Sequence, residues 1–170
     1  MADGKNGNGN GAATETAAQK DVGPIQAQIV SQYIRDLSFE NPNVDKIMGA
    51  GPGENPNIQL EVNVDAKTAD ATNKIYESAI SFRAHATSKI GTIYELEAVY
   101  AGLFRIQSIP PEALQPFLLV NCPSVLFPFL RRLIADITRE GGFPPLLLDP
   151  IDFGTLYMQR KKEMQQAAKS

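Results

Sequence analysis

The chain has very few of the side chains that usually carry catalysis or bind metals. Its 170 residues include one cysteine, one histidine and no tryptophan. A single cysteine excludes an intrachain disulfide and suits a reducing compartment. No two cysteines or histidines have the spacing of a zinc site, so we expect neither a bound metal nor another cofactor.

An excess of charge of one sign is also missing. The net charge is −3, and no lysine- or arginine-rich patch is interleaved with aromatic residues, so nucleic acid is not an expected partner. The N-terminus has neither the basic nor the apolar region of a secretory signal. Charges such as Asp65 and Glu77 interrupt the long hydrophobic stretches, and none is expected to reach the roughly 20 residues of a membrane helix. We therefore expect a cytoplasmic protein without direct membrane insertion.

The few candidates for chemistry have simpler interpretations. His85 is expected on the polar face of a strand beside Arg83, with no pair of groups to orient it as a general base. Cys122 lies in an apolar stretch, which favours a packing role over an activated thiolate. Residues 49–53 alternate glycine with other residues, but prolines replace the helix whose N-terminus would hold a phosphate. We therefore expect no catalytic residue, and not an enzyme.

The first 22 residues are rich in Gly, Asn, Ala and Thr, a composition typical of a disordered tail. Residues 23–168 are expected to form a single domain. It begins with four stretches in which apolar and polar residues alternate, which indicates half-buried strands: residues 25–40, 58–65, 76–85 and 94–106. Such alternation is typical of an antiparallel sheet with one covered face.

The first and second predicted strands are joined by a long crossover, residues 41–57, whereas residues 88–91 form a hairpin-sized turn between the third and fourth. On the first strand, the alternation assigns six residues to the apolar face: Ile25, Ala27, Ile29, Tyr33, Leu37 and Phe39. Arg35 breaks the pattern on that face.

After residue 110 the apolar spacing becomes helical. We predict a short helix over residues 112–119, a break at 121–123, a longer helix over 124–140 and a last one over 153–167, with Asp152 as its N-cap. The apolar arc of the longer helix spans roughly 200°, which is wider than packing on one sheet requires. The surplus predicts an interface with another copy of the chain, formed by Leu126, Leu130, Leu133, Ile134 and Ile137.

The polar face of the predicted sheet is rich in carboxylates. The alternation places seven of them there: Asp36, Glu40, Glu61, Asp65, Glu77, Glu95 and Glu97. The face opposes them with only two strong bases, Arg83 and Arg105. Two interpretations remain open, a solvated face that resists aggregation and a docking face for a basic partner.

Two segments are apolar where loops are usually polar. Residues 143–148 (FPPLLL) carry four large hydrophobic side chains, and the crossover adds Val44, Ile47 and Met48. One interpretation is a satellite core beneath each loop. The alternative is an exposed groove for hydrophobic segments of other chains.

Three long motifs give the sequence a resemblance to a known family. Residues 35–42 (RDLSFENP), 122–131 (CPSVLFPFLR) and 141–153 (GGFPPLLLDPIDF) resemble, in order and at compatible distances, motifs of the SecB family of bacterial protein-export chaperones. The end of the fourth predicted strand, residues 101–104, is similar to the same family. The resemblance covers about residues 25–158.

The resemblance implies an α+β fold: a four-stranded antiparallel sheet with helices packed on one face, assembled as a homotetramer that is a dimer of dimers. It implies an ATP-independent holding chaperone that keeps exported precursors unfolded in the cytosol and delivers them to the translocation ATPase SecA. A small ligand-binding protein or enzyme with a sheet-and-helix cavity is the alternative. A third possibility is an adaptor that uses only the acidic face.

The resemblance also assigns binding residues. SecA would dock on Asp36, Glu40 and Glu97, and on Glu95, where the family can carry leucine. Unfolded precursors would bind the crossover and the 143–148 loop through six residues: Val44, Ile47, Met48, Phe143, Leu146 and Leu148. The C-terminal segment departs from the family pattern, because it is basic where better-known members have an acidic tail.

Overall fold

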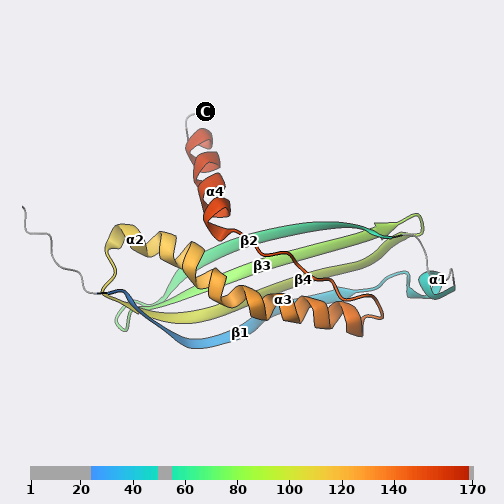
Figure 1. Ribbon diagram of the computed structural model, residues 1–170, viewed down its shortest axis with the longest axis horizontal. Helices are drawn as coiled ribbons and strands as arrows, with labels where there is room; N and C mark the ends of the chain where they lie inside the picture. Colours follow the sequence, from blue (N-terminus) through green and yellow to red (C-terminus); the bar gives the residue numbers. More distant parts are fainter. Residues whose placement is uncertain (1–23, 50–54, 169–170) are drawn as a thin grey trace, which may run out of the picture.

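The computed structural model describes residues 24–49 and 55–168; the tail predicted to be disordered, residues 1–22, lies outside them. Four antiparallel strands form one sheet in the order β1-β4-β3-β2 (Figure 1). The strands are β1 (Gln26–Glu40), β2 (Asn57–Asp70), β3 (Ile75–Ser88) and β4 (Gly91–Gln107). The predicted α+β sheet is therefore confirmed. The crossover from β1 to β2 connects its two edges.

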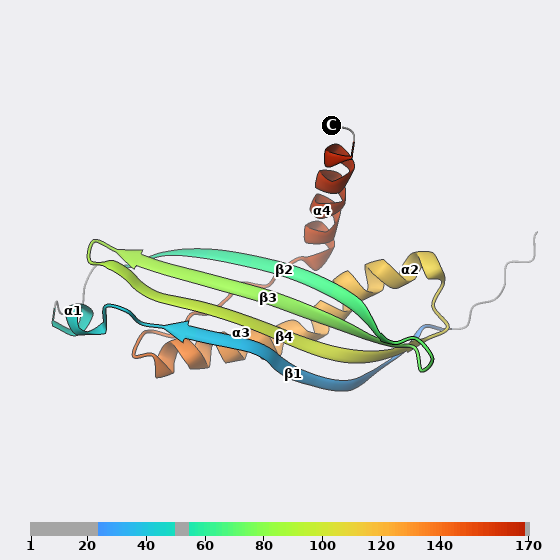
Figure 2. The same cartoon turned by 180° about the vertical axis from the view of Figure 1, so that it is seen from behind.

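Within the described residues, the helices lie on one face of the sheet and leave the other bare, as the two opposite views show (Figures 1 and 2). Helices α2 (Pro111–Pro116) and α3 (Cys122–Glu140) run across that face, α1 (Val44–Gly49) lies at one end of the sheet, and α4 (Phe153–Ala167) projects away from it. Asp152 caps α4 by accepting a hydrogen bond from Thr155 N at 2.9 Å, as predicted. Helix α1, within the crossover, was not predicted.

The core fills the space between the sheet and α3. Leu126, Leu130 and Ile134 are fully buried on the inner side of α3, against the alternate residues of β3 and β4 that the sequence pattern placed on the apolar face. Gly102 permits this close approach, because a Cβ atom there would lie 2.8 Å from Leu126 Cδ2.

Strand β1 corrects part of the sequence analysis. Its pairing with β4 shifts between Ile29 and Ser31 and again near residue 35, and each bulge inserts one residue and reverses the alternation. Tyr33 therefore lies opposite Ala101, on the bare face and not on the apolar face where it was predicted. The second shift restores the pattern, so that Leu37 and Phe39 lie on the face covered by helices.

The helical segment after residue 110 also differs from the prediction. A π-helical turn, Phe117–Asn121, joins α2 to α3 without the predicted break. Its wider spacing, seen in the bond from Cys122 N to Phe117 O, accommodates Pro123, which has no backbone N–H to donate.

The resulting 30-residue segment, Pro111–Glu140, is long and apolar enough to cross a membrane by length and composition alone. The expectation that no such stretch exists is therefore wrong. The segment nevertheless packs as the core helix of this domain, because the inner side of α3 is buried against the sheet.

Candidate binding surfaces

The bare face of the sheet carries the predicted acidic residues in cross-strand rows. Glu40 lies opposite Glu95, which lies opposite His85; in the next row, Glu97 lies opposite Arg83. One ion pair and one histidine contact result: Arg83 Nη2 is 2.5 Å from Glu97 Oε1, and His85 Nδ1 is 2.9 Å from Glu95 Oε1. Of the four predicted SecA-binding carboxylates, Glu97 is thus partly neutralised by Arg83, and Glu95 is in contact with His85.

The other two predicted docking carboxylates, Asp36 and Glu40, are exposed on the edge strand β1. Neither makes an ion pair within the described residues. Asp36, Glu61 and Glu97 line an open depression of about 370 Å³ on this face. We call Asp36, Glu40, Glu61, Glu95 and Glu97 the acidic end of the bare face.

Glu77 does not belong to that solvated set, although the alternation placed it there. Its side chain is buried; it accepts a hydrogen bond from Tyr33 Oη and another from Arg35 Nη1 at 2.6 Å, and lies 3.4 Å from Lys67 Nζ. Burial acts to raise the pKa of Glu77, but the Tyr33 bond and the two cations outweigh it and hold the pKa below its ordinary value. Glu77 is therefore a neutralised structural carboxylate.

On the helical side, three aromatic rings form a cluster below the end of α3. Phe143 lies 5.1 Å from Tyr94 and 6.5 Å from Phe39 between ring centroids, and Phe39 stacks on Tyr94 at 5.7 Å. Burial raises the pKa of Tyr94. Phe143 was a predicted client-binding residue, whereas the alternation indicated only a core position for Phe39 and Tyr94 and did not predict their contacts with it.

The structure brings the two predicted client-binding loops together at this cluster. The methyl group of Met48 lies 3.4 Å from the Cβ position of Gly142. Asn43 Nδ2 donates to Thr92 O at 2.8 Å, and Asn41 Nδ2 donates to Gly141 O at 3.5 Å. The crossover is therefore tied to the β3–β4 hairpin and to the end of α3.

The apolar side chains of these loops differ in how much they expose. Met48 and Leu147 are 62% and 67% exposed, and Val44 is also exposed. Ile47, Phe143 and Leu146 are half-buried against the core, and Leu148 belongs to the core itself. Leu147 was not predicted as a client-binding residue, because the sequence does not indicate which of three consecutive leucines is exposed to solvent.

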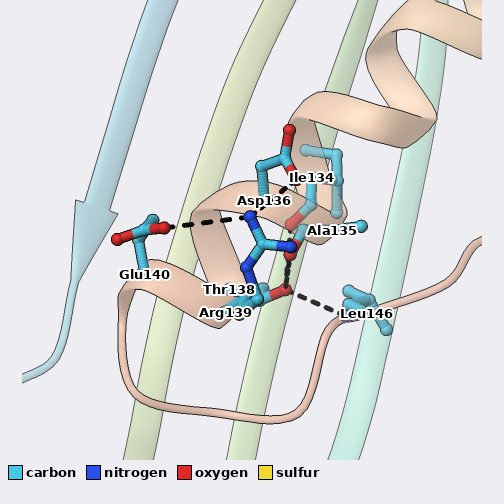
Figure 3. A network of polar contacts seen from close by, with 7 residues as sticks. All are labelled: Ile134, Ala135, Asp136, Thr138, Arg139, Glu140 and Leu146. Atoms are coloured by element: carbon cyan, nitrogen blue, oxygen red, sulfur yellow. Dashed lines mark hydrogen bonds and ion pairs between the residues drawn. The ribbon is translucent and has the colours of Figure 1, made fainter.

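Thr138 fixes the loop that follows α3 (Figure 3). Its buried hydroxyl donates to Ile134 O and accepts from Leu146 N, both at 2.9 Å, and its carbonyl accepts from Phe143 N at 3.1 Å. One residue, through its hydroxyl and its backbone carbonyl, thus holds both ends of the 143–146 segment. We call Val44, Met48, Phe143, Leu146 and Leu147 the apolar loop surface.

The outer side of α3 carries a second apolar stripe. Val125 and Phe129 are 45% and 40% exposed, and Phe129 stacks on Tyr100 at 6.3 Å between centroids. Of the predicted interface residues, Leu133 and Ile137 are half-buried, whereas Leu126, Leu130 and Ile134 are already buried against the chain's own sheet. The apolar surface that α3 leaves accessible is therefore centred on Val125, Phe129 and Leu133.

The candidates for chemistry are unsuited to it. Cys122 is buried, and burial raises the pKa of its thiol to about 12, so the reactive thiolate is scarce at neutral pH. His85 is half-exposed beside Glu95 on an open face. Within residues 24–49 and 55–168, no group of three His, Cys, Asp or Glu side chains could hold a metal ion.

Comparison with known proteins identifies the family. The family model described as preprotein translocase subunit SecB matches residues 19–164. Protein-export protein SecB of Afipia carboxidovorans is 43% identical over 159 residues, covering 92% of this chain and 97% of that protein, and that of Roseobacter denitrificans is 47% identical over 148 residues, 86% of each. A Mycobacterium tuberculosis SecB-like chaperone, solved with an antitoxin peptide, shares the fold (TM-score 0.58, 19% identity, 74% of this chain and 90% of that one). The chain belongs to the SecB family.

Proposed function

We propose that this chain is an ATP-independent holding chaperone for protein export. It keeps precursors unfolded in the cytoplasm and delivers them to the translocation ATPase SecA, with residues 23–168 as one chaperone domain. Membership of the SecB family supports this function, and the apolar loop surface is the observation that carries it in this chain. The alternative of a ligand cavity between sheet and helices is not favoured, because Leu126, Leu130 and Ile134 fill that space.

The apolar loop surface offers what an unfolded chain lacks in water, a place to bury hydrophobic side chains. Folded proteins have already buried theirs and offer little to bind. Covering about 1,000 Å² of apolar client surface contributes about 25 kcal/mol at about 25 cal/mol per Å². Ordering the client and losing its translational freedom offset most of this, which leaves binding that is useful and reversible.

The test of the client site replaces its two most exposed members, Met48→Ser and Leu147→Ser. The double variant is expected to suppress aggregation of a denatured client several-fold less efficiently, measured by light scattering, because exposed apolar area is lost without disturbing the core. Met158→Ser with Met164→Ser is the matched control, since these exposed methionines lie on α4. Full activity of the first variant, or an equal loss in the control, would contradict the proposed site.

For SecA docking we propose the acidic end of the bare face, with Asp36 and Glu40 as the carboxylates available without breaking an internal pair. Exposed charges are screened over about 10 Å at 0.1 M salt, so the affinity should fall as salt rises. Asp36→Lys with Glu40→Lys should abolish SecA binding in calorimetry and leave client holding intact. Glu112→Lys with Glu163→Lys, which changes exposed helical carboxylates equally, should bind SecA much more tightly than that variant.

We further propose the homotetramer, a dimer of dimers, with the outer stripe of α3 inside an interface. Exposed large apolar side chains in a contiguous stripe are typical of surfaces that another chain covers. Val125 and Phe129 supply that stripe here.

A further inference from the structure

The bare face has a second polar feature, at the opposite end from the carboxylates. A hollow of about 500 Å³ lies where the β2–β3 turn meets the end of β4, lined by Thr72, Asn73, Lys74, Arg105, Gln107 and Ser108. Every one of these side chains can donate a hydrogen bond, and none is a carboxylate. We call it the cationic hollow.

The backbone holds this hollow in a defined shape. Lys74 and Ser108 have φ angles of 54° and 57°, and they are the non-glycine residues with a left-handed backbone in the described parts of the chain. Ile106 N donates to Lys74 O at 3.1 Å, which ties the turn to β4. Backbone conformations that side chains rarely adopt cluster at functional sites.

Among the described residues, the two cations have no carboxylate partner. Neither Lys74 nor Arg105 makes an ion pair with any residue in the ranges 24–49 and 55–168. Asp70, the nearest acid in the turn, instead accepts hydrogen bonds from Asn73 N at 3.1 Å and Nδ2 at 2.7 Å. On β4, Arg105 lies between Gln28 and Ile75 in its cross-strand row, so these two neighbours supply no counter-charge.

Along β4 the bare face therefore changes sign. Arg105 lies eight residues from Glu97, or about 26 Å at about 3.3 Å per residue. Between them β4 carries Val99, Ala101 and Leu103 on this face. The neighbouring strands add Glu77, whose charge Arg35 and Lys67 neutralise, and the exposed Asp65 in the row of Ala101. The result is an acidic end, a middle that is apolar along β4, and a cationic end on one surface.

We propose that the cationic hollow receives an acidic segment of the same protein that docks on the acidic end. This rests on the proposed docking function and deepens it: the partner must carry a basic patch and, about 26 Å away along β4, a carboxylate-rich one. A surface with both signs fixes the orientation of its partner, because the reversed pose brings like charges together. The occupant is thus an acidic protein segment.

The experiment measures SecA binding to the full chain carrying Lys74→Glu with Arg105→Glu. Affinity is expected to fall about 3- to 30-fold at low salt, as for the loss of two exposed charge pairs, and the difference should shrink at high salt. Lys161→Glu with Lys162→Glu on α4 makes the same change in net charge elsewhere and is expected to bind normally. Unchanged light scattering and client holding would show that the variants remain folded.

The outcomes separate this inference from the docking proposal itself. If the acidic-end variant loses SecA while the hollow variant binds like wild type, or if the α4 control loses as much, the inference is overturned and docking stands. If wild type does not bind SecA, the docking proposal fails. Titration of the full chain with a ten-residue glutamate peptide, followed by NMR, then tests the cationic hollow by itself. NMR shifts confined to Lys74, Arg105 and their neighbours would support it. No shifts, or equal shifts with inorganic phosphate, would overturn it.

Discussion

At the scale of single residues, buried polar side chains help to hold the strands of the sheet together. The carboxylate of Glu77 is buried, and its contacts with Tyr33, Arg35 and Lys67 stabilise its charge there. Alternation predicted the face of Glu77 correctly but could not predict its burial, because the bulges that bring Tyr33 and Arg35 to it depend on pairing across strands. Local sequence specifies a residue's face more readily than its partners.

We expect Glu77→Gln to lower the free energy of unfolding by about 1–3 kcal/mol at pH 7, because it removes charge-assisted hydrogen bonds from a buried site. The pKa of Glu77 is held below its usual value of 4.5, so its contribution is present above that pH and disappears as the pH falls through the folded pKa. Denaturant unfolding at several pH values checks this. A difference between the proteins that grows in acid would contradict it.

Gly102 gives a prediction about packing. Gly102→Ala should destabilise the domain by about 1–3 kcal/mol, because the added Cβ would overlap Leu126 and the ring of Phe104, which lies 2.9 Å away. Gly49→Ala is the control, since no described atom lies within 4 Å of its Cβ position. Thermal unfolding of both variants is the measurement. Equal stability of Gly102→Ala and wild type would show that α3 can move away from the sheet at little cost.

At the scale of elements, the strands and helices followed from periodicity, and their junctions did not. Alternation located all four strands and one face of each of β2, β3 and β4. On β1 it assigned Tyr33 to the wrong face, because two bulges each shift the alternation by one residue. The predicted break between the helices is absent because a π-helical turn can accommodate Pro123. Helix α1 was not predicted because six residues in a Gly/Pro-rich crossover are too few to show a helical pattern.

At the Leu146 end, the loop after α3 is held by the hydroxyl of Thr138. Thr138→Val keeps the shape of the side chain but leaves Leu146 N without its acceptor, which costs about 1–3 kcal/mol. We expect faster amide exchange at Leu146 and weaker client holding, whereas Thr138→Ser retains the hydroxyl and should stay near wild type. If the valine variant exchanges and holds clients normally, Thr138 does not position the apolar loop surface.

At the scale of the whole molecule, the wide apolar arc predicted for α3 indicated a second burial partner besides the sheet. In the fold, the chain's own sheet buries one part of that arc and leaves another part exposed. The inner residues Leu126, Leu130 and Ile134 are used by the sheet, so a charge there would unfold the domain and say nothing about assembly. The width of an apolar arc does not reveal which residues meet which partner. Val125 and Phe129 stay exposed, and they are the residues proposed to meet another copy.

Phe129→Glu with Val125→Glu is therefore expected to reduce the proposed tetramer to a smaller species, because burying unpaired charges costs several kcal/mol. Multi-angle light scattering gives the mass, and circular dichroism should show the secondary structure intact. Met158→Glu with Met164→Glu on α4 adds the same charges to exposed positions elsewhere. A wild-type monomer at micromolar concentration would contradict the assembly.

The central claim is that this protein holds unfolded chains by burying their apolar side chains. The most direct test is calorimetric titration of one client, unfolded and folded, at several temperatures and salt concentrations without nucleotide. We predict binding of the unfolded form only, with a negative heat-capacity change, since apolar burial has that signature, and with little dependence on salt. Equal binding of the folded client, or a heat-capacity change near zero with strong salt dependence, would contradict the account.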